Sequence, residues 1–157
     1  IKYVYNIQIT NEGEIAGYAK EIKDYIPEGL RFEAADNTEW NWTKVSDDVI
    51  TTDYLADTLL QPGDTATVPV VLTWINNSEN LGEKINLAEI SKDYNNSGTP
   101  DIDSTPDNKV PDEDDIDDAP VILAIKTGTA QTYLGLTAII LITIASGISL
   151  IKKYVLE

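Results

Sequence analysis

Residues 67–74 read Thr-Val-Pro-Val-Val-Leu-Thr-Trp, and this octapeptide decides the class of fold. Large apolar side chains occupy every second position, at Val68, Val70, Leu72 and Trp74. This period of two is typical of a β-strand with one buried face, because successive side chains of a strand point to opposite sides of its sheet. Pro69 has no N–H to donate to a neighbouring strand, so we expect an edge or a bulge of the sheet at that point.

Similar extended stretches lie on both sides of this octapeptide. Together with it, the expected strands are residues 1–10, 15–26, 30–32, 39–43, 49–52 and 84–91. Turn-forming residues separate several of them, at 11–14, 27–29 and 61–64. About seven short strands with turns roughly every eight to twelve residues predict an all-β fold, an antiparallel β-sandwich over residues 1–91.

Three motifs within this region resemble a known family. They are Asn-Ile-Gln-Ile-Thr-Asn-Glu-Gly at 6–13, Asp-Tyr-Ile-Pro-Glu-Gly-Leu-Arg-Phe at 24–32 and Leu-Gln-Pro-Gly-Asp at 60–64. In this order they are similar to the "conserved repeat" β-sandwich family of unknown function from large bacterial and archaeal surface proteins, although Ile26 stands where that family usually has leucine. The resemblance covers residues 1–91 and implies an immunoglobulin-like spacer or adhesin module of Gram-positive cell surfaces. It implies a structural or interaction role and no catalysis.

The composition excludes several classes of function. The net charge is −16 and Arg31 is the single arginine, which argues against nucleic-acid binding because that requires clustered cations. The chain has no cysteine and no histidine, so it lacks disulfides, thiolate metal sites and the usual general base. A hydrolase could still use two carboxylates, but nothing in the sequence places such a pair in a cleft. We therefore expect no enzymatic activity.

Residues 92–118 form an Asp-rich segment that we expect to be a linker or a calcium-binding segment. Asp93, Asn95, Ser97, Gly98 and Asp101 match the spacing of a calcium loop, in which oxygen ligands alternate around a glycine. Ser104, at the twelfth position, replaces the usual bidentate glutamate. The candidate calcium ligands are Asp93, Asn95, Asp101, Asp103, Asp107, Asp114 and Asp115. The alternative is a solvated acidic spacer that extends by self-repulsion.

The C-terminal part of the chain predicts a membrane anchor. Residues 119–126 return to strand character and are expected to be a final strand or a stalk. Residues 127–151 carry no charge, and at about 1.5 Å per residue a helix of this length exceeds a hydrocarbon core of about 30 Å. Lys152 and Lys153 follow at once, so residues 152–157 are expected to be a cytoplasmic tail and the N-terminal domain to be extracellular.

Lys126, Thr127 and Gly128, with the apolar run and the basic pair, are similar to the Leu-Pro-x-Thr-Gly sorting signal of sortase substrates. A sortase would cut between Thr127 and Gly128 and link the new carboxyl group to peptidoglycan. Ala124 and Ile125 stand where leucine and proline belong, so permanent anchoring in the plasma membrane is the preferred interpretation and sortase anchoring the alternative.

Together these features predict a non-catalytic, single-pass cell-surface stalk. It would be the membrane-proximal end of a larger exported protein, with the lipid bilayer and neighbouring surface-protein domains as its partners. The alternative function is an adhesin that binds a glycan or a matrix molecule. Trp40 and Trp42 could form its binding face if their strand faced solvent, whereas Trp74 is expected in the core.

Overall fold

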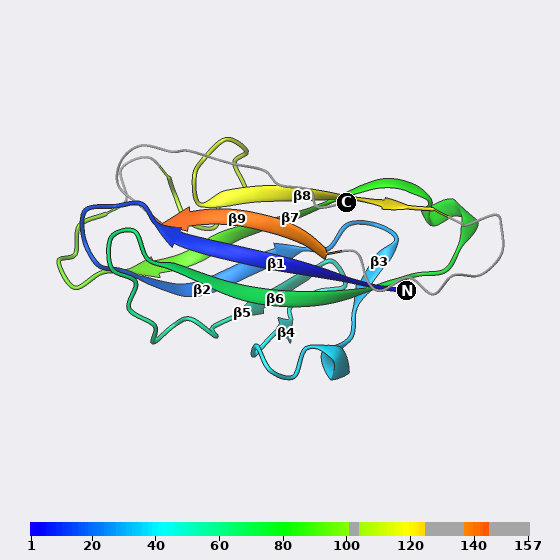
Figure 1. Ribbon diagram of the computed structural model, residues 1–157, viewed down its shortest axis with the longest axis horizontal. Helices are drawn as coiled ribbons and strands as arrows, with labels where there is room; N and C mark the ends of the chain where they lie inside the picture. Colours follow the sequence, from blue (N-terminus) through cyan, green and yellow to red (C-terminus); the bar gives the residue numbers. More distant parts are fainter. Residues whose placement is uncertain (101–103, 125–136, 145–157) are drawn as a thin grey trace.

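The computed structural model describes residues 1–100 and 104–124, together with the backbone of residues 137–144. The chain folds into nine β-strands and two short 3-10 helices within this part, and the strands form two sheets (Figure 1). The first sheet has the order β3 (Leu30–Phe32), β6 (Thr65–Trp74), β1 (Lys2–Asn11), β9 (Thr137–Ile144). The second has the order β4 (Thr43–Lys44), β5 (Val49–Thr52), β2 (Tyr18–Tyr25), β7 (Gly82–Tyr94), β8 (Ile116–Leu123). The 3-10 helices are η1 (Ala34–Asp36) and η2 (Ser78–Asn80).

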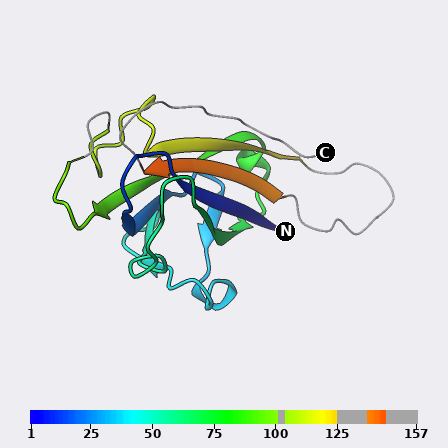
Figure 2. The ribbon, with the colours of Figure 1, turned by 60° about the vertical axis from the view of Figure 1, so that its left-hand side comes forward.

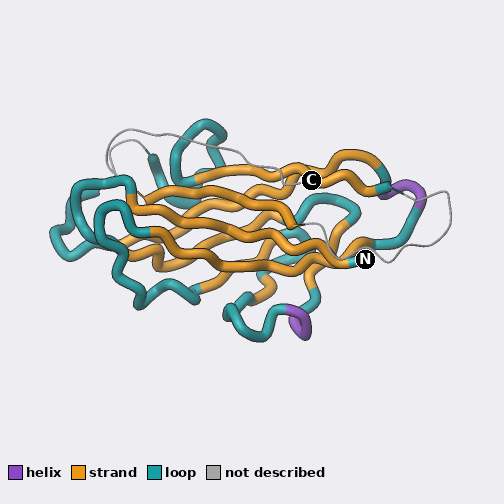
Figure 3. Tube along the Cα trace, viewed as in Figure 1, coloured by secondary structure: helices purple, strands orange, loops and turns teal. Residues whose placement is uncertain are grey.

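The predicted all-β fold of antiparallel sheets is confirmed, and its core follows the alternation in the sequence. All pairs among β1 to β8 are antiparallel, and among the described strands β9 alone runs parallel to its neighbour, β1. Tyr5 pairs with Val70 and Ile7 with Val68, and all four side chains are fully buried between the sheets. The core therefore forms where the inward positions of β1 and β6 meet those of β2 and β7. Figure 3 shows the loops mainly at the two ends of the strands.

At one pole of the sandwich, Asn11 links two of the motifs noted in the sequence. Its backbone N–H donates to the Asp64 carbonyl at 2.9 Å, and its side-chain amide donates to the Leu60 carbonyl at 2.8 Å. Its side-chain oxygen accepts from the Gly13 N–H at 3.0 Å, and its own carbonyl accepts from Gly63 at 2.7 Å. The end of β1 and the turn before β6 are therefore joined through the backbone and the buried side chain of one residue, Asn11.

At the opposite pole, the Pro-Glu-Gly turn leads into β3. Gly29 has a φ of +94°, which is strained for any residue with a side chain. A Cβ atom at this position would lie 3.1 Å from the Asn80 Cβ, so η2 packs directly against the turn. The Gly29 carbonyl also accepts from the Ile75 N–H at 2.8 Å. Glycine is therefore the residue that fits here, because it adopts the positive φ without strain and has no Cβ atom to collide with Asn80.

Pro69 lies at an edge of its sheet, as expected. The pairing of β3 with β6 extends only from Trp74 to Leu72, so no described strand flanks β6 on that side at Pro69. Two side chains cover the exposed edge: the Trp42 indole donates to the Pro69 carbonyl at 2.8 Å, and the Asn37 amide exchanges two hydrogen bonds with the Val71 backbone. These contacts satisfy edge groups that could otherwise pair with another chain.

The C-terminal elements are described only in part. Residues 119–123 belong to β8, which pairs with β7. Of the predicted membrane helix at 127–151, the structure describes residues 137–144 alone, as strand β9; the rest of that span and residues 152–157 lie outside the described part. The sorting-signal candidates Lys126, Thr127 and Gly128 also lie outside it. Among the described residues, no helix has the length and hydrophobicity needed to cross a bilayer.

Candidate functional site

Residues 104–115, here called the strap, lead into β8 and lie across the face of β2 and β7 that points away from the core. The Ile90 N–H donates to the Asp115 carbonyl at 2.9 Å, and the Lys109 N–H donates to a carboxylate oxygen of Glu89 at 3.1 Å. Much of the segment that the sequence marks as acidic is thus attached to the sheet.

Glu89 is the centre of this attachment. Its side chain is fully buried, although it lies on the outer face of β7, because the strap covers it. A buried carboxylate is costly unless it accepts hydrogen bonds. The Tyr25 hydroxyl donates to one of its oxygens, and the Lys109 N–H donates to the other. Burial raises the pKa of Tyr25, and the hydrogen bond to Glu89 raises it further, so the phenol stays protonated as a donor.

Two cations complete the contacts between strap and sheet. Lys23 of β2 forms an ion pair with Asp107 of the strap. The Lys109 ammonium group lies 4.1 Å from the centre of the Tyr25 ring, within the range of a cation–π contact. The middle of the strap is therefore held to β2 by two separate contacts.

The strap is also bonded internally. The Glu113 carboxylate accepts from the Thr105 N–H and from the Asn108 amide, each at 2.9 Å. Three non-glycine residues of the strap have a positive φ, namely 65° at Asp107, 53° at Lys109 and 77° at Asp112. Such left-handed residues are uncommon and persist where surrounding contacts hold them. The tight winding of the strap thus depends on its internal hydrogen bonds and on its contacts with the sheet.

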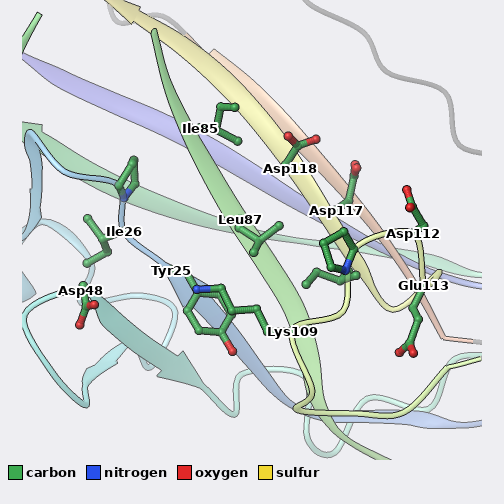
Figure 4. A pocket seen from close by; sticks show the side chains of 13 residues that line it. Tyr25, Ile26, Asp48, Ile85, Leu87, Lys109, Asp112, Glu113, Asp117 and Asp118 are labelled. Atoms are coloured by element: carbon green, nitrogen blue, oxygen red, sulfur yellow. The ribbon is translucent and has the colours of Figure 1, made fainter. Parts of the chain in front are cut away.

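A pocket of about 590 Å³ opens between the strap, β2, β7 and β8 (Figure 4). Its apolar wall comes from Ile26, Pro27, Ile85, Leu87, Pro111 and Ile116, and Tyr25 lies beside it. Its charged wall comes from Asp48, Asp112, Glu113, Asp117 and Asp118, with Lys109 as the lining cation. The pocket has the charge to attract a cationic group, and its lining offers carboxylates without a histidine or a cysteine.

The candidate calcium ligands lie in different surroundings. Asp93 is exposed near the end of β7, and the Asn95 side-chain oxygen accepts from the Thr99 N–H at 3.1 Å within a turn. Asp101 and Asp103 lie outside the described residues.

The remaining candidates belong to the strap. Asp107 is engaged with Lys23, whereas Asp114 and Asp115 are both buried just before β8. Within the described part of the chain, no three carboxylates are gathered to hold a metal ion. Calcium binding stays a prediction, with two of its seven candidate residues outside that part.

A second polar group, in the core itself, was missed by sequence reasoning. Asp24 is fully buried on β2, and the Asn86 amide of β7 donates to its carboxylate at 2.5 Å. Burial raises the pKa of Asp24 to about 7. The signal was present in the sequence, because Asp24 continues the alternation of Ile22 and Ile26, which are both buried. A search for apolar periodicity passes over a carboxylate at an inward position.

The tryptophans do not form the paired face that the adhesin alternative suggested. Trp42 is 6 % exposed and belongs to the core, and Trp40 packs partly buried against it. The predicted strand at 39–43 is a turn up to Asn41, and β4 begins only at Thr43. Trp74 is buried, as expected.

Comparisons with family models, with curated proteins and with solved structures gave no significant match. The resemblance to the conserved-repeat family therefore rests on the three sequence motifs alone.

Proposed function

We propose that this chain is a non-catalytic stalk module of a cell surface, an immunoglobulin-like sandwich that holds upstream domains away from a bilayer. The observation that carries the proposal is the order of its parts. A β-sandwich with a continuous core is followed by an uncharged apolar run at 127–151 and then by Lys152 and Lys153. An apolar run of this length with a basic flank is the pattern of a single-pass anchor.

The architecture of the sandwich supports a mechanical role. The ten residues of β1 span about 33 Å, and hydrogen-bonded turns close both poles. The Asn11 network fixes one pole and the contact of Gly29 with η2 fixes the other. A sandwich closed at both ends is a compact body, which is what a spacer between upstream domains and a bilayer requires.

The strap adds a second layer to the same body. Lys23, Glu89 and Tyr25 hold it to the sheet, so most of the acidic segment becomes part of the module instead of a loose tether. Calcium bound by some of the candidate ligands in residues 92–118 would stiffen this segment further. This part of the proposal predicts that calcium raises the melting temperature of the full chain, and an unchanged melting temperature in millimolar calcium would contradict it.

The membrane part is tested by fractionating a Gram-positive host that exports the full chain. We expect the protein in the membrane fraction after an alkaline carbonate wash, with the sandwich open to protease on intact cells. Leu136→Arg puts a charge three residues from the middle of the apolar run, at a cost of about 3 kcal/mol near a bilayer centre, and leaves uncharged stretches of 9 and 15 residues on its two sides. It should release the protein into the wash, and Leu136→Ala is the matched control. Recovery of the unmodified chain in the wash would refute the anchor.

The same cells decide between a permanent anchor and sortase processing. A wall fraction that contains peptides ending at Thr127 and linked to peptidoglycan would replace the permanent anchor with sortase cleavage. If no such peptide is found while the intact chain stays in the membrane, permanent anchoring is supported.

The acidic pocket favours the adhesin alternative to a limited extent, because a partly apolar cavity of about 590 Å³ could admit a cationic side chain of a matrix protein. Glycan and matrix-protein arrays probed with the full chain in detergent test it. Binding that Asp112→Asn and Glu113→Gln both weaken would support an adhesin role, and uniformly negative arrays would support the stalk.

A further inference from the structure

Strand β9 occupies the outer edge of β1 in parallel register. Its eight residues pair from Val4 with Thr137 to Asn11 with Ile144. Figures 1 and 2 both show it between β1 of one sheet and β8 of the other, and its backbone also contacts β7 and β8. β9 thus closes one side of the sandwich along the line where the two sheets meet.

The same eight residues lie inside the apolar run that the proposed function assigns to the bilayer. A membrane helix satisfies its backbone groups within itself, whereas β9 uses the N–H and C=O groups of the β1 edge. Residues 137–144 cannot do both at once. The two positions are therefore alternative states of one segment.

We propose that the outer edge of β1 is a strand-acceptor site, and that residues 137–144 occupy it whenever the apolar run is outside a bilayer. This inference rests on the proposed function, because the second state requires membrane insertion. The segment Thr-Ala-Ile-Ile-Leu-Ile-Thr-Ile suits the site, since it is uncharged and rich in β-branched residues. An open edge of this kind pairs readily with other chains, and the docked segment protects it.

Exchange between the two states changes where the chain leaves the sandwich. β8 ends at Leu123, which pairs with Gly82 at the pole where β1 begins. β9 runs parallel to β1 and ends beside Asn11, at the opposite pole. With the segment docked, the chain enters the sandwich at β1 and leaves it after β9, at opposite poles. With the segment in a bilayer, the chain leaves after β8, at the pole where β1 begins, and the β1 edge is free for another strand.

Disulfide trapping tests the site directly, because the chain has no native cysteine. Asn6→Cys with Ile139→Cys joins two residues that are paired in register. The control is Asn6→Cys with Thr143→Cys, which lies four residues out of register, about 13 Å along the strand and beyond the reach of a disulfide. Each full-length variant is oxidised in detergent-free buffer and after reconstitution into phosphatidylglycerol vesicles, and circular dichroism first verifies its β-sheet content.

In buffer, we expect the in-register pair to form an intrachain disulfide in most molecules and the control to form at least fivefold less. In vesicles, the in-register disulfide should fall at least fivefold. Equal trapping of both pairs, no trapping in buffer, or a disulfide between two chains would overturn the proposal. A second in-register pair, Gln8→Cys with Leu141→Cys, serves if the first variant does not fold.

The result is separable from the test of the anchor. Trapping in buffer by a chain that never stays in membranes would mean that the proposed function fails while the acceptor site stands. Membrane retention without trapping in buffer would mean that the proposed function stands while the acceptor site fails. Leu136→Arg, outside the paired residues 137–144, should abolish membrane retention and leave the disulfide in buffer unchanged.

Discussion

Replacing Asp24 with asparagine is expected to stabilise the fold at neutral and alkaline pH and to leave it nearly unchanged in acid. Asp24 is fully buried between the sheets, where the Asn86 amide donates to one of its oxygens and the other has no hydrogen-bond partner among the described residues. Tyr5 of the opposite sheet lies close enough to Asp24 for the two groups to interact electrostatically, and its buried hydroxyl group also has no hydrogen-bond partner among the described residues. Such a site favours the neutral acid, and burial raises the pKa of Asp24 from 3.8 to about 7.

The sign and size of the effect follow from proton linkage. Between pH 4 and pH 7 the folded chain keeps a proton on Asp24 that the unfolded chain has released, so the free energy of unfolding falls by about 1.4 kcal/mol for each pH unit. Above pH 7 both states are ionised and the loss stays constant at about 4 kcal/mol. The asparagine introduced at this position is an uncharged isostere that can still accept from Asn86, so the variant avoids this loss.

Urea denaturation of the full chain in detergent, from pH 5 to pH 9, measures the difference between wild type and Asp24→Asn. We expect the advantage of the variant to grow by about 3 kcal/mol over this range. Asp57→Asn is the control, because its side chain is fully exposed, and it should change stability by less than about 0.5 kcal/mol. An Asp24→Asn advantage that is constant with pH would refute the reasoning, since it would mean that the buried acid does not titrate in this window.

Three further substitutions test the poles and the strap. Gly29→Ala should lower stability in urea by about 2–3 kcal/mol, because it combines a positive φ with a 3.1 Å contact to Asn80. Gly63→Ala, at a φ of +85° in open space, should cost about 1 kcal/mol. Equal losses would mean that the contact with Asn80 adds nothing to the cost. Asn11→Ala removes the acceptor of the buried Gly13 N–H and the amide's bonds to the Ile15 and Leu60 carbonyls, although the Leu60 carbonyl keeps the Gly17 N–H. It should lower stability by about 1–3 kcal/mol, and a loss below about 0.5 kcal/mol would argue against the network. Tyr25→Phe removes a hydrogen-bond donor from buried Glu89, so it should lower stability by about 1–3 kcal/mol and increase amide hydrogen exchange in the strap. Unchanged exchange would mean that this hydrogen bond does not hold the strap to the sheet.

The sequence predicted those parts of the fold that depend on local pattern. The inward residues of β1 and β6 are large and apolar, so a period of two identifies both strands and their buried faces. Turns at Gly29 and Gly63 were equally visible, because few residues other than glycine adopt a positive φ without strain.

The candidate site was harder to predict, because it depends on contacts between distant residues. Glu89 lies on the outward side of β7, where a charged residue normally meets solvent, and it is buried only because the strap folds back over it. Residues 104–115 have a composition typical of disorder, and nothing local in them indicates the ion pair with Lys23 or the contact with Tyr25. The acidic pocket was missed for the same reason, since strap and sheet form it together.

The positions of the recognisable motifs bear on the choice between stalk and adhesin. Asn11 and the turn at 60–64 meet at one pole, and the turn at Gly29 packs against η2 at the other. A ligand-binding module would be expected to carry its distinctive side chains on an exposed face, as loops presented by a rigid scaffold usually do. Here they are buried or occupied in closing the ends of the sandwich, which is a structural role. A stalk needs such ends and an adhesin does not, so the placement of these residues favours the stalk.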